Sequence, residues 1–403
     1  MPLFNKHIFQ IAMVALTILL HSEAIAQVLP SSADLSYLYS NSSPISLRHQ
    51  LVSSDDKEWI LLELNAPKVV ADSLLFEFAT TSSLDRPLSA FAKLETSGLR
   101  IFQSDSRQIF AIDITELDTR FVIFRVVKQA TSKALTYIVE LGPASNFIFV
   151  TSQLTIPDLN GYINANASLK ISTYNGKTKQ YGIKFYNKPF KPARPPMGDM
   201  VPLNIFEDPD TIFTTTSGSF LPTNKKGVYA IFSEDQEEYS SFLRVEDSQF
   251  PKVATVEDII NASVYLWTSD EFKKLKDSED PKKTFDRFWL NNTNSPSRAG
   301  KAISAYFNRV KEANEKFTTF KEGWKTDMGM IYIIFGPPDK AFRTNDGFQW
   351  VYKKTYELPG FTFTFFKNSK YFTSEIYELE RSTQFQNIWF RAIELWRKGR
   401  KSI

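Results

Sequence analysis

The sequence contains no cysteine and very few histidines. Without cysteine the chain can form no disulfide, no thiolate metal site and no cysteine nucleophile, and no lipid can be attached at an N-terminal cysteine. Of the three histidines, His7 and His21 lie in a first segment that has the pattern of an export signal, so His49 alone remains beyond it. This shortage argues against a histidine metal site and against a Ser-His-Asp triad.

Long hydrophobic runs are scarce as well. The one candidate extends from Ile8 to Leu20, follows the basic residue Lys6, and precedes the small-residue pattern AIA at 24–26. The run is too short to span a membrane, and this layout is typical of a cleaved signal peptide. A retained anchor helix is the alternative, which the same length argument disfavours. We therefore expect residues 1–26 to be removed, no transmembrane segment to remain, and the protein to be exported to the periplasm or the cell surface.

The chain also lacks a large excess of positive or negative charge, and it lacks the common catalytic motifs. The formal net charge is +3, and no basic stripe with interleaved aromatic residues indicates nucleic-acid binding. The sequence has no G-x-S-x-G, no P-loop and no G-x-G-x-x-G pattern. The acidic segment at 233–239 lacks the central glycine and spaced ligands of a calcium loop. We therefore predict no cofactor, no metal ligand and no catalytic residue.

Aromatic residues, by contrast, are plentiful: they make up 14% of the chain, and 35 of them are phenylalanine. Up to about residue 252, short runs rich in aromatic and β-branched residues alternate with turn residues, which predicts β-strands. The expected strands are 59–65, 73–80, 106–114, 120–127, 134–141, 146–156, 169–175, 181–187, 227–233 and 241–247. We interpret residues 27–143 as an Ig-like, sandwich-type domain that begins with a loose leader over 27–45, and residues 144–252 as a second β-rich domain.

Helical patterns begin after about residue 253, which predicts a C-terminal α+β domain over 253–403. Thr255 and Asp280 are candidate helix caps, and the clearest amphipathic helix covers 297–320. Strands are expected at 330–336, 348–353, 360–366 and 371–379, with a turn at 367–370. A last helix over 382–398 is expected to start with a capping box from Thr383 to Gln386. The predicted fold is therefore multidomain, with all-β modules followed by helices on a small antiparallel sheet.

One stretch of the C-terminal region, GWKTDMGMIYIIFGPPDK at 323–340, places turn residues on both sides of an apolar run. Its punctuating residues are Gly323, Trp324, Thr326, Asp327, Gly329, Gly336, Pro337, Pro338 and Asp339. Upstream, and in order, lie Phe288, Trp289, Arg309, Val310, Ala313, Asn314 and Phe317. Together these residues resemble the GWxTD domain family, which is found mainly in exported proteins of Bacteroidota and related bacteria. Met328 departs from the pattern, because members often have arginine there. The resemblance implies a fold unit and a cell-envelope setting, and it implies no activity.

Most of this motif is explained by structure without chemistry. Thr326 and Asp327 can hydrogen-bond to neighbouring backbone amides and hold a turn, while the glycines allow backbone angles closed to other residues. We expect Trp324 to cover one end of the sheet against the 302–317 helix. Asp327 and Asp339 would lie at opposite ends of a strand about 20 Å long. An acid–base pair needs about 5–10 Å, so these two do not form one, although either could pair with Asp346 or Glu375.

The favoured hypothesis is a non-catalytic binding or scaffold protein of the cell envelope, whose GWxTD domain engages a protein partner of unknown identity. The export pattern, the shortage of catalytic side chains and the modular β-rich layout support it. Two alternatives stay open. One is a carboxylate-dependent envelope hydrolase, which a converging cluster of buried acids would favour. The other is a carbohydrate-binding protein, which an exposed row of aromatic residues would favour.

Overall fold

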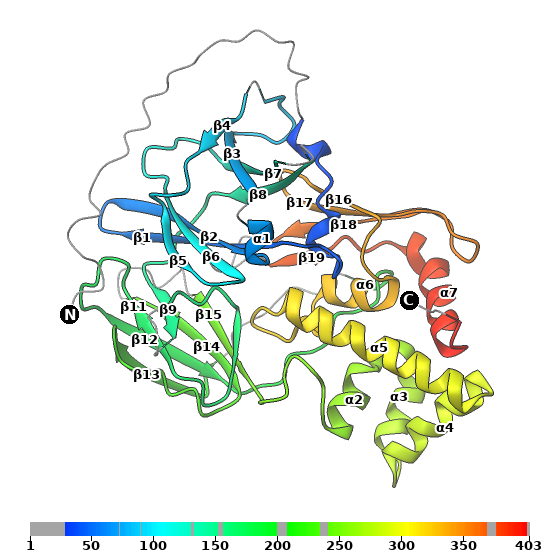
Figure 1. Ribbon diagram of the computed structural model, residues 1–403. Coiled ribbons are helices and arrows are strands. Elements are labelled where there is room, and N and C mark those ends of the chain that lie inside the picture. Colours follow the sequence, from blue (N-terminus) through cyan, green and yellow to red (C-terminus); the bar gives the residue numbers. More distant parts are fainter. Residues whose placement is uncertain are drawn as a thin grey trace.

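The computed structural model describes residues 29–71, 73–88, 90–129, 133–151, 156–199, 208–233, 241–368 and 376–400. The predicted signal peptide, most of the acidic segment at 233–239, and Glu375 lie outside these ranges. The described chain forms two β-rich regions followed by helices and a small antiparallel sheet, as predicted. In Figure 1 the first β-rich region is at the top, the second at the lower left and the helices at the lower right. No helix within these ranges is both long and apolar enough to cross a bilayer.

The first β-rich region is a sandwich of two four-stranded sheets. One sheet contains, in spatial order, β1 (Ser46–Ser54), β2 (Lys57–Asn65), β6 (Arg107–Asp113) and β5 (Arg100–Gln103). The other contains β4 (Ala92–Leu94), β3 (Leu74–Thr81), β7 (Phe121–Lys128) and β8 (Lys133–Glu140), and the short helix α1 (Lys68–Ala71) connects β2 to β3. Ile60, Leu62, Phe76, Phe110 and Phe124 fill the space between the sheets. Their burial removes apolar surface from water, which is the main stabilising term for such a fold.

The second β-rich region has a five-stranded sheet and a two-stranded sheet around its own core. The larger sheet contains, in spatial order, β10 (Tyr162–Asn164), β15 (Ser241–Glu246), β14 (Gly227–Phe232), β12 (Gln180–Tyr186) and β13 (Thr211–Thr216). The smaller one pairs β9 (Ile148–Thr151) with β11 (Leu169–Ser172). After β12 the proline-rich stretch forms no regular element between residues 187 and 199. It runs along the C-terminal region, where the Ala193 amide donates to the Lys325 carbonyl (2.9 Å).

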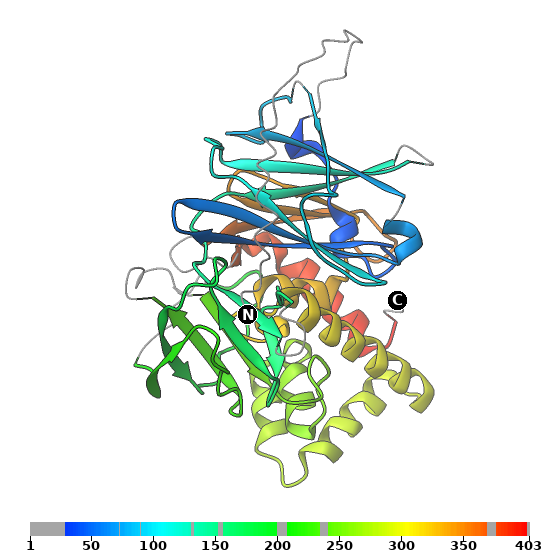
Figure 2. The same cartoon turned by 60° about the vertical axis from the view of Figure 1, so that its left-hand side comes forward.

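The C-terminal region combines helices with one antiparallel sheet. Its helices are α2 (Val256–Ala262), α3 (Ser269–Lys276), α4 (Pro281–Thr293), α5 (Pro296–Phe317), α6 (Asp327–Phe335) and α7 (Gln386–Arg397), with 3-10 turns η3 (Val264–Leu266), η4 (Gly323–Lys325) and η5 (Thr383–Phe385). Its sheet has the order β16 (Lys340–Arg343), β17 (Gly347–Tyr352), β18 (Phe361–Lys367), β19 (Tyr377–Leu379). Thr255 and Asp280 cap α2 and α4, as predicted. The turned view of Figure 2 shows the helices beneath the sandwich.

The C-terminal sheet is joined to the sandwich by buried charges. Glu140 at the end of β8 accepts hydrogen bonds from Arg343 (2.7 Å) and Lys367 (2.9 Å), which lie on β16 and β18. Burial by itself would raise the pKa of Glu140, but the hydrogen bond and charge of Lys367, with Arg343 and Arg120, hold it below its ordinary value. The side chain of Asn345 in the β16–β17 turn also accepts from the Leu84 amide (2.9 Å). The two regions therefore share a specific polar contact as well as an apolar core.

The secondary structure of the apolar run after Gly329 was predicted wrongly. Residues 330–335 belong to helix α6, whereas the sequence interpretation expected a strand. All nine residues of α6 are buried, so the run shows no hydrophobic face, and periodicity cannot separate a buried helix from a buried strand. The Thr326 side chain accepts from the Gly329 amide and starts the helix, and Gly336 with φ +88° ends it. These two cap signals were present in the sequence.

Three smaller expectations also need correction or fall outside the described residues. The last helix does not start with a capping box from Thr383: Ser382 accepts from the Gln384 amide and opens η5, while α7 has no side-chain cap. The leader over 27–45 is not loose where it is described, because Leu35 and Tyr39 are buried in the C-terminal core. The predicted 367–370 turn and 371–379 strand extend into undescribed residues, and β19 covers only Tyr377–Leu379.

Candidate functional site

The candidate site is the signature turn, residues 323–329, which connects α5 to α6 through η4. Its two glycines are required by close backbone contacts. A Cβ on Gly323 would lie 2.0 Å from the Ala313 carbonyl oxygen, and one on Gly329 would lie 1.8 Å from the Gly323 carbonyl oxygen. No side chain can replace hydrogen at these distances without moving backbone. The turn is therefore packed directly onto α5, which is why the sequence has glycine at both positions.

Thr326 and Asp327 hold the start of α6. The Thr326 hydroxyl donates to the Gly323 carbonyl (2.7 Å) and accepts from the Gly329 amide (3.0 Å). Asp327 Oδ2 accepts from the Leu379 amide in β19 (2.8 Å), and its Oδ1 lies 2.5 Å from Arg381 Nη2. A carboxylate at the first turn of a helix is also stabilised by the helix dipole. Asp327 therefore has three roles: it lies in the first turn of α6, it accepts a hydrogen bond from β19, and it pairs with Arg381.

Trp324 is buried, with 5% of its surface exposed. Its ring lies edge-to-face against Tyr265 of η3, with the centroids 6.3 Å apart, and its carbonyl accepts from the Tyr265 hydroxyl (2.9 Å). The Trp324 amide donates to Asn314 Oδ1 (3.0 Å), and Asn314 Nδ2 donates to the Pro251 carbonyl (2.9 Å). Asn314 therefore uses both ends of its amide to connect α5, the turn and the end of the second β-rich region.

Four charged side chains form a buried cluster where the second β-rich region meets the turn. We call Arg244, Glu246, Glu322 and Lys325 the junction cluster. Arg244 pairs with Glu246 on the same face of β15 and with Glu322 Oε1 (2.9 Å), and it donates to the Phe320 carbonyl (2.8 Å). Lys325 Nζ also binds Glu322 Oε1 (2.9 Å). Sequence reasoning missed this cluster, although arginine and glutamate two residues apart on a predicted buried strand were a usable signal.

The cations of the junction cluster keep the Glu322 carboxylate ionised. Burial by itself would raise the pKa of Glu322, but the charges of Arg244 and Lys325 and the Lys325 hydrogen bond lower it below the ordinary value of 4.5. A general acid at neutral pH requires the opposite shift. The second oxygen, Glu322 Oε2, has no hydrogen-bond partner among the described residues. The electrostatics of the turn thus favour a fixed ion pair over proton transfer.

The other end of α6 is held by the hydroxyl of Tyr352 and the guanidinium of Arg309. The Gly336 carbonyl accepts from the Tyr352 hydroxyl (2.8 Å), and Arg309 Nη1 donates to the Ile333 carbonyl (3.2 Å). The Arg309 guanidinium lies 5.1 Å from the Trp396 ring centroid, and a Cβ on Gly336 would lie 3.0 Å from Arg309 Nη2. A cation at a helix C-terminus is favoured by the dipole. Arg309, a residue of the resemblance motif, therefore stabilises the end of α6.

The turn after α6 reaches the surface. Pro338 is buried, while Pro337 and Asp339 are exposed, and Asp339 Oδ2 accepts from the Lys353 amide (2.7 Å). The remaining motif residues form core: Trp289, Val310, Ala313 and Phe317 are buried in the main apolar cluster. Phe288 packs against the Trp267 ring at 3.8 Å between centroids.

The acidic residues do not converge. Asp327 binds Leu379 and Arg381, whereas Asp339 binds the Lys353 amide and lies beyond the other end of α6. Asp346, one of the two possible acidic partners, lies 3.7 Å from Arg120. Within the described ranges no group of three or more His, Asp or Glu side chains has the arrangement of a metal site. The buried acids that the structure brings to the turn are each matched by a cation.

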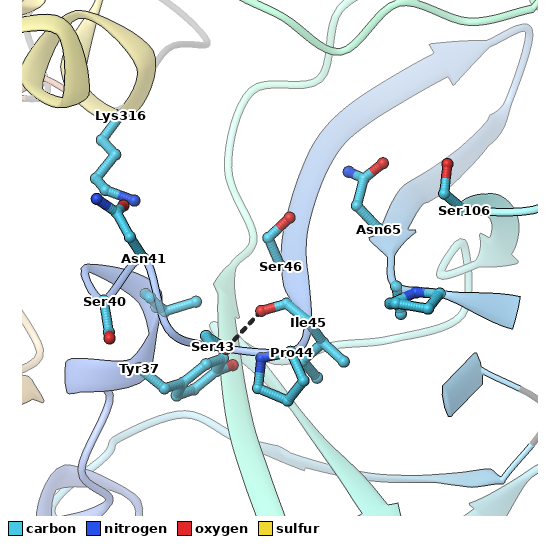
Figure 3. Close-up of a pocket in the computed structure, with 13 residues that line it drawn as sticks. Tyr37, Ser40, Asn41, Ser43, Pro44, Ile45, Ser46, Asn65, Ser106 and Lys316 are labelled. Carbon is cyan, nitrogen blue, oxygen red and sulfur yellow. Dashed lines mark hydrogen bonds between the residues drawn. The ribbon is translucent and has the colours of Figure 1, made fainter. Parts of the chain in front are cut away.

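A cavity of about 400 Å³ lies apart from the turn, between the sandwich and the C-terminal end of α5. Figure 3 shows Lys316 pointing toward Asn41, with Asn65 and Ser106 on the opposite wall. Its lining contains hydroxyls and amides from residues 40–46, and no aspartate, glutamate or histidine. Burial lowers the pKa of Lys316, which Glu312 and Glu315 partly offset. The cavity can offer hydrogen bonds and one cation, and its lining has no acid–base pair.

Comparison with known proteins gives a match to one protein family. The GWxTD domain family matches residues 227–398, from the first residue of β14 to the end of α7. The matched segment thus includes the strand that carries Arg244 and Glu246 as well as the helices and the sheet. No curated protein and no solved structure shows a significant match to the chain.

Proposed function

Because this chain belongs to the family of GWxTD domain-containing proteins, we propose that it is a non-catalytic scaffold or binding protein of the cell envelope whose GWxTD domain engages a protein partner. The export pattern at residues 1–26 supports the envelope location. The first β-rich region contacts the C-terminal sheet through Glu140, and β15 contacts the signature turn through Arg244. Such an arrangement suits a protein that presents one surface in a fixed orientation.

The observation that carries this proposal is the burial of the signature turn. Gly323, Trp324, Thr326, Asp327 and Gly329 are all buried, and each forms a backbone contact or a hydrogen bond within the protein. A residue that must touch a substrate has to reach a cavity or the surface. The family-defining residues instead hold α6 against α5 and β19, which supports a role in building the domain.

An exposed aromatic edge offers a place for the partner. Tyr356, in the loop between β17 and β18, is fully exposed, and Phe390 on α7 is 54% exposed. Tyr356 precedes Glu357 in the sequence and Phe390 precedes Arg391, and the ion pair Glu357–Arg391 connects that loop to α7. Exposed tyrosine and phenylalanine are enriched at protein–protein contacts. We place the partner-binding surface on this edge of the domain.

A point-variant capture experiment tests the proposal. The full chain is expressed with Tyr356→Ser and Phe390→Ser, and proteins cross-linked to it in the envelope are compared with those of the unmodified chain. The matched control replaces two exposed apolar residues on the second β-rich region, Ile212→Ser and Phe220→Ser. We expect loss of a specific cross-linked protein with the first variant alone. Equal capture by both variants would remove the partner-binding proposal for this edge.

A carbohydrate-binding function is the second candidate, and the cavity near Lys316 favours it. Amide and hydroxyl side chains such as Asn41, Asn65 and Ser106 can bind sugar hydroxyls, and Tyr37 supplies an aromatic wall. Calorimetric titration with soluble envelope glycans would measure this binding. Loss of a measured binding signal on Asn65→Ala would support the candidate, and the absence of any signal with the unmodified chain would remove it.

A further inference from the structure

The cavity of about 400 Å³ beside α5 has a single charged side chain in its lining, that of Lys316. Lys316 belongs to the last turn of α5, and in Figure 3 its side chain extends from that helix toward Asn41. The side chain is half-buried, and its ammonium forms no hydrogen bond or ion pair with any other residue that the structure describes. Buried lysines are almost always paired, so an unpaired lysine that faces a cavity is a candidate ligand-binding group.

The acidic residues near Lys316 are engaged elsewhere. Glu312 Oε2 accepts from the Tyr332 hydroxyl (2.8 Å), and Glu315 pairs with Lys311 (3.0 Å). Burial is the largest influence on Lys316 and lowers its pKa, and the two glutamates offset this only in part. The ammonium is therefore less well solvated than it would be in water. An anion in the cavity would replace the interactions that the ammonium has lost.

The rest of the lining offers neutral hydrogen-bonding groups. The side chains of Asn41, Ser46 and Ser106 form no hydrogen bond with another residue in the described ranges. Amides and hydroxyls can both donate and accept, which suits the hydroxyl groups of a sugar. The Tyr37 hydroxyl already donates to the Thr136 carbonyl (3.0 Å), so this residue offers the cavity mainly its ring.

A neighbouring cavity provides a contrast. Its volume is about 370 Å³, and it shares part of its lining with the first cavity, namely Tyr37, Ser40, Ser43 and Pro44. The other residues that line it are serines, a leucine and the two prolines of the turn after α6, and none of them is charged. The first cavity therefore differs from its neighbour by the ammonium of Lys316, and the first alone can distinguish a charged ligand from a neutral one.

We propose that the cavity near Lys316 binds an anionic sugar, whose acidic group pairs with the Lys316 ammonium while its hydroxyls bind Asn41, Ser46 and Ser106. The inference rests on the second candidate function, because it names the class of carbohydrate that the cavity takes. One unpaired cation matches one acidic group, which can be a carboxylate or a phosphate. Hydrogen bonds to an ionised group are about twice as strong as neutral ones, so the acidic group would dominate selectivity.

Ligand-observed NMR titrations at constant ionic strength test the proposal on the full chain. The acidic probes are glucuronate and glucose 6-phosphate, the neutral probe is glucose, and acetate and inorganic phosphate are anions without a sugar. Lys316→Gln removes the charge, and Asn41→Asp places a carboxylate at the exposed position toward which Lys316 points. The matched control is Lys311→Gln, which removes a lysine of the same helix that pairs with Glu315 and does not line the cavity. Circular dichroism confirms that each chain is folded.

We expect at least one acidic sugar to bind the unmodified chain about tenfold more tightly than glucose does. The acidic sugar with the higher affinity then identifies the acidic group as a carboxylate or a phosphate. Lys316→Gln should abolish this preference, and so should Asn41→Asp, because its carboxylate neutralises the ammonium within the chain. Lys311→Gln should retain it. Retention of the preference in either of the first two variants would overturn the inference.

Two further results would also overturn it. Equal affinity for the acidic and the neutral sugars would show that charge is not selected, and it would leave the second candidate function standing. Acetate or inorganic phosphate binding as tightly as the acidic sugars would show that the cavity takes a bare anion. If no sugar binds, the inference and the second candidate function fail together, while the capture experiment with Tyr356 and Phe390 tests the scaffold proposal separately.

Discussion

The two ends of helix α6 have similar residue types in the sequence, glycine and aspartate, but different surroundings in the structure. The N-terminal end combines Gly323 and Gly329 with Asp327, and it is buried among ion pairs from β15 and from Arg381. The C-terminal end combines Gly336 with Asp339, and its turn reaches solvent. There a tyrosine hydroxyl and one arginine bind the last carbonyls of the helix.

The difference shows that similar residue types can have unequal energetic importance. Breaking a buried ion pair leaves a charge without compensation and costs about 3–5 kcal/mol. Changing an exposed aspartate that binds one backbone amide costs little. The N-terminal end joins the helices, the C-terminal sheet and the second β-rich region, while the C-terminal end mainly redirects the chain into β16. We therefore expect substitutions to separate the two ends sharply.

The largest effect is expected for Gly323→Ala. The added Cβ would lie 2.0 Å from the Ala313 carbonyl oxygen, so α5 or the turn must move. We expect a loss of more than about 4 kcal/mol in the free energy of unfolding, or no folded protein. The matched control is Gly300→Ala on the exposed face of α5, where nothing lies within 4 Å of the new Cβ. That change should stabilise by about 0.5–1 kcal/mol in urea titration. Equal effects would contradict the close packing of the turn.

Aromatic substitutions should give the next largest contrast. Trp324→Ala removes a buried ring and should cost about 3–5 kcal/mol. At the other end of α6, Tyr352→Phe removes only the hydroxyl that binds the Gly336 carbonyl and should cost about 1 kcal/mol. Thermal and urea unfolding measure both. An unchanged stability of Trp324→Ala with altered partner capture would show that the indole acts in binding and not in the core.

The same aspartate substitution at both ends tests the comparison most directly. Asp327→Asn keeps an acceptor for the Leu379 amide and removes the charge that pairs with Arg381, so it should cost about 3 kcal/mol. Asp339→Asn also keeps its acceptor, for the Lys353 amide, and should change stability by less than about 0.5 kcal/mol. If the two variants unfold at the same urea concentration, charge does not distinguish the ends.

The smallest effect concerns pH. The pKa of Glu322 is lower in the folded protein than its ordinary value of 4.5, so the unfolded chain binds more protons in acid. The stability from this ion pair is therefore complete above that ordinary value and is lost as pH falls through the folded pKa. A difference of one pKa unit between the folded and unfolded chain corresponds to about 1.4 kcal/mol. Urea titrations between pH 3 and 6 measure the slope of stability against pH. Glu322→Gln should reduce the slope of the free energy of unfolding against pH. An unchanged slope would show that Glu322 does not cause it.

Local patterns predicted most elements, and one clear failure lies where burial removed the pattern. Thr255 and Asp280 lie at helix starts because capping is decided by neighbours in sequence. The 330–336 segment failed because a helix buried on every side has no amphipathic period. The short strands β4, β5 and β10 have three or four residues each, too few to give a reliable alternation. The motif residues of the turn were found in the sequence, while Arg244 and Arg381 were not, because they come from distant segments.

Near neighbours and repeating patterns along the chain were enough to predict the β-rich modules, the main amphipathic helix, the starts of α2, α4 and α5, and the glycines and aspartates of the signature turn. Three further features arise only when the chain folds: the turn contacts β15 through the Arg244–Glu322 ion pair, Arg381 pairs with Asp327, and Leu35 and Tyr39 join the apolar core of the C-terminal region. Those contacts join residues separated by many tens of positions. Their stability comes from burial and charge pairing in three dimensions, for which a local pattern carries no signal.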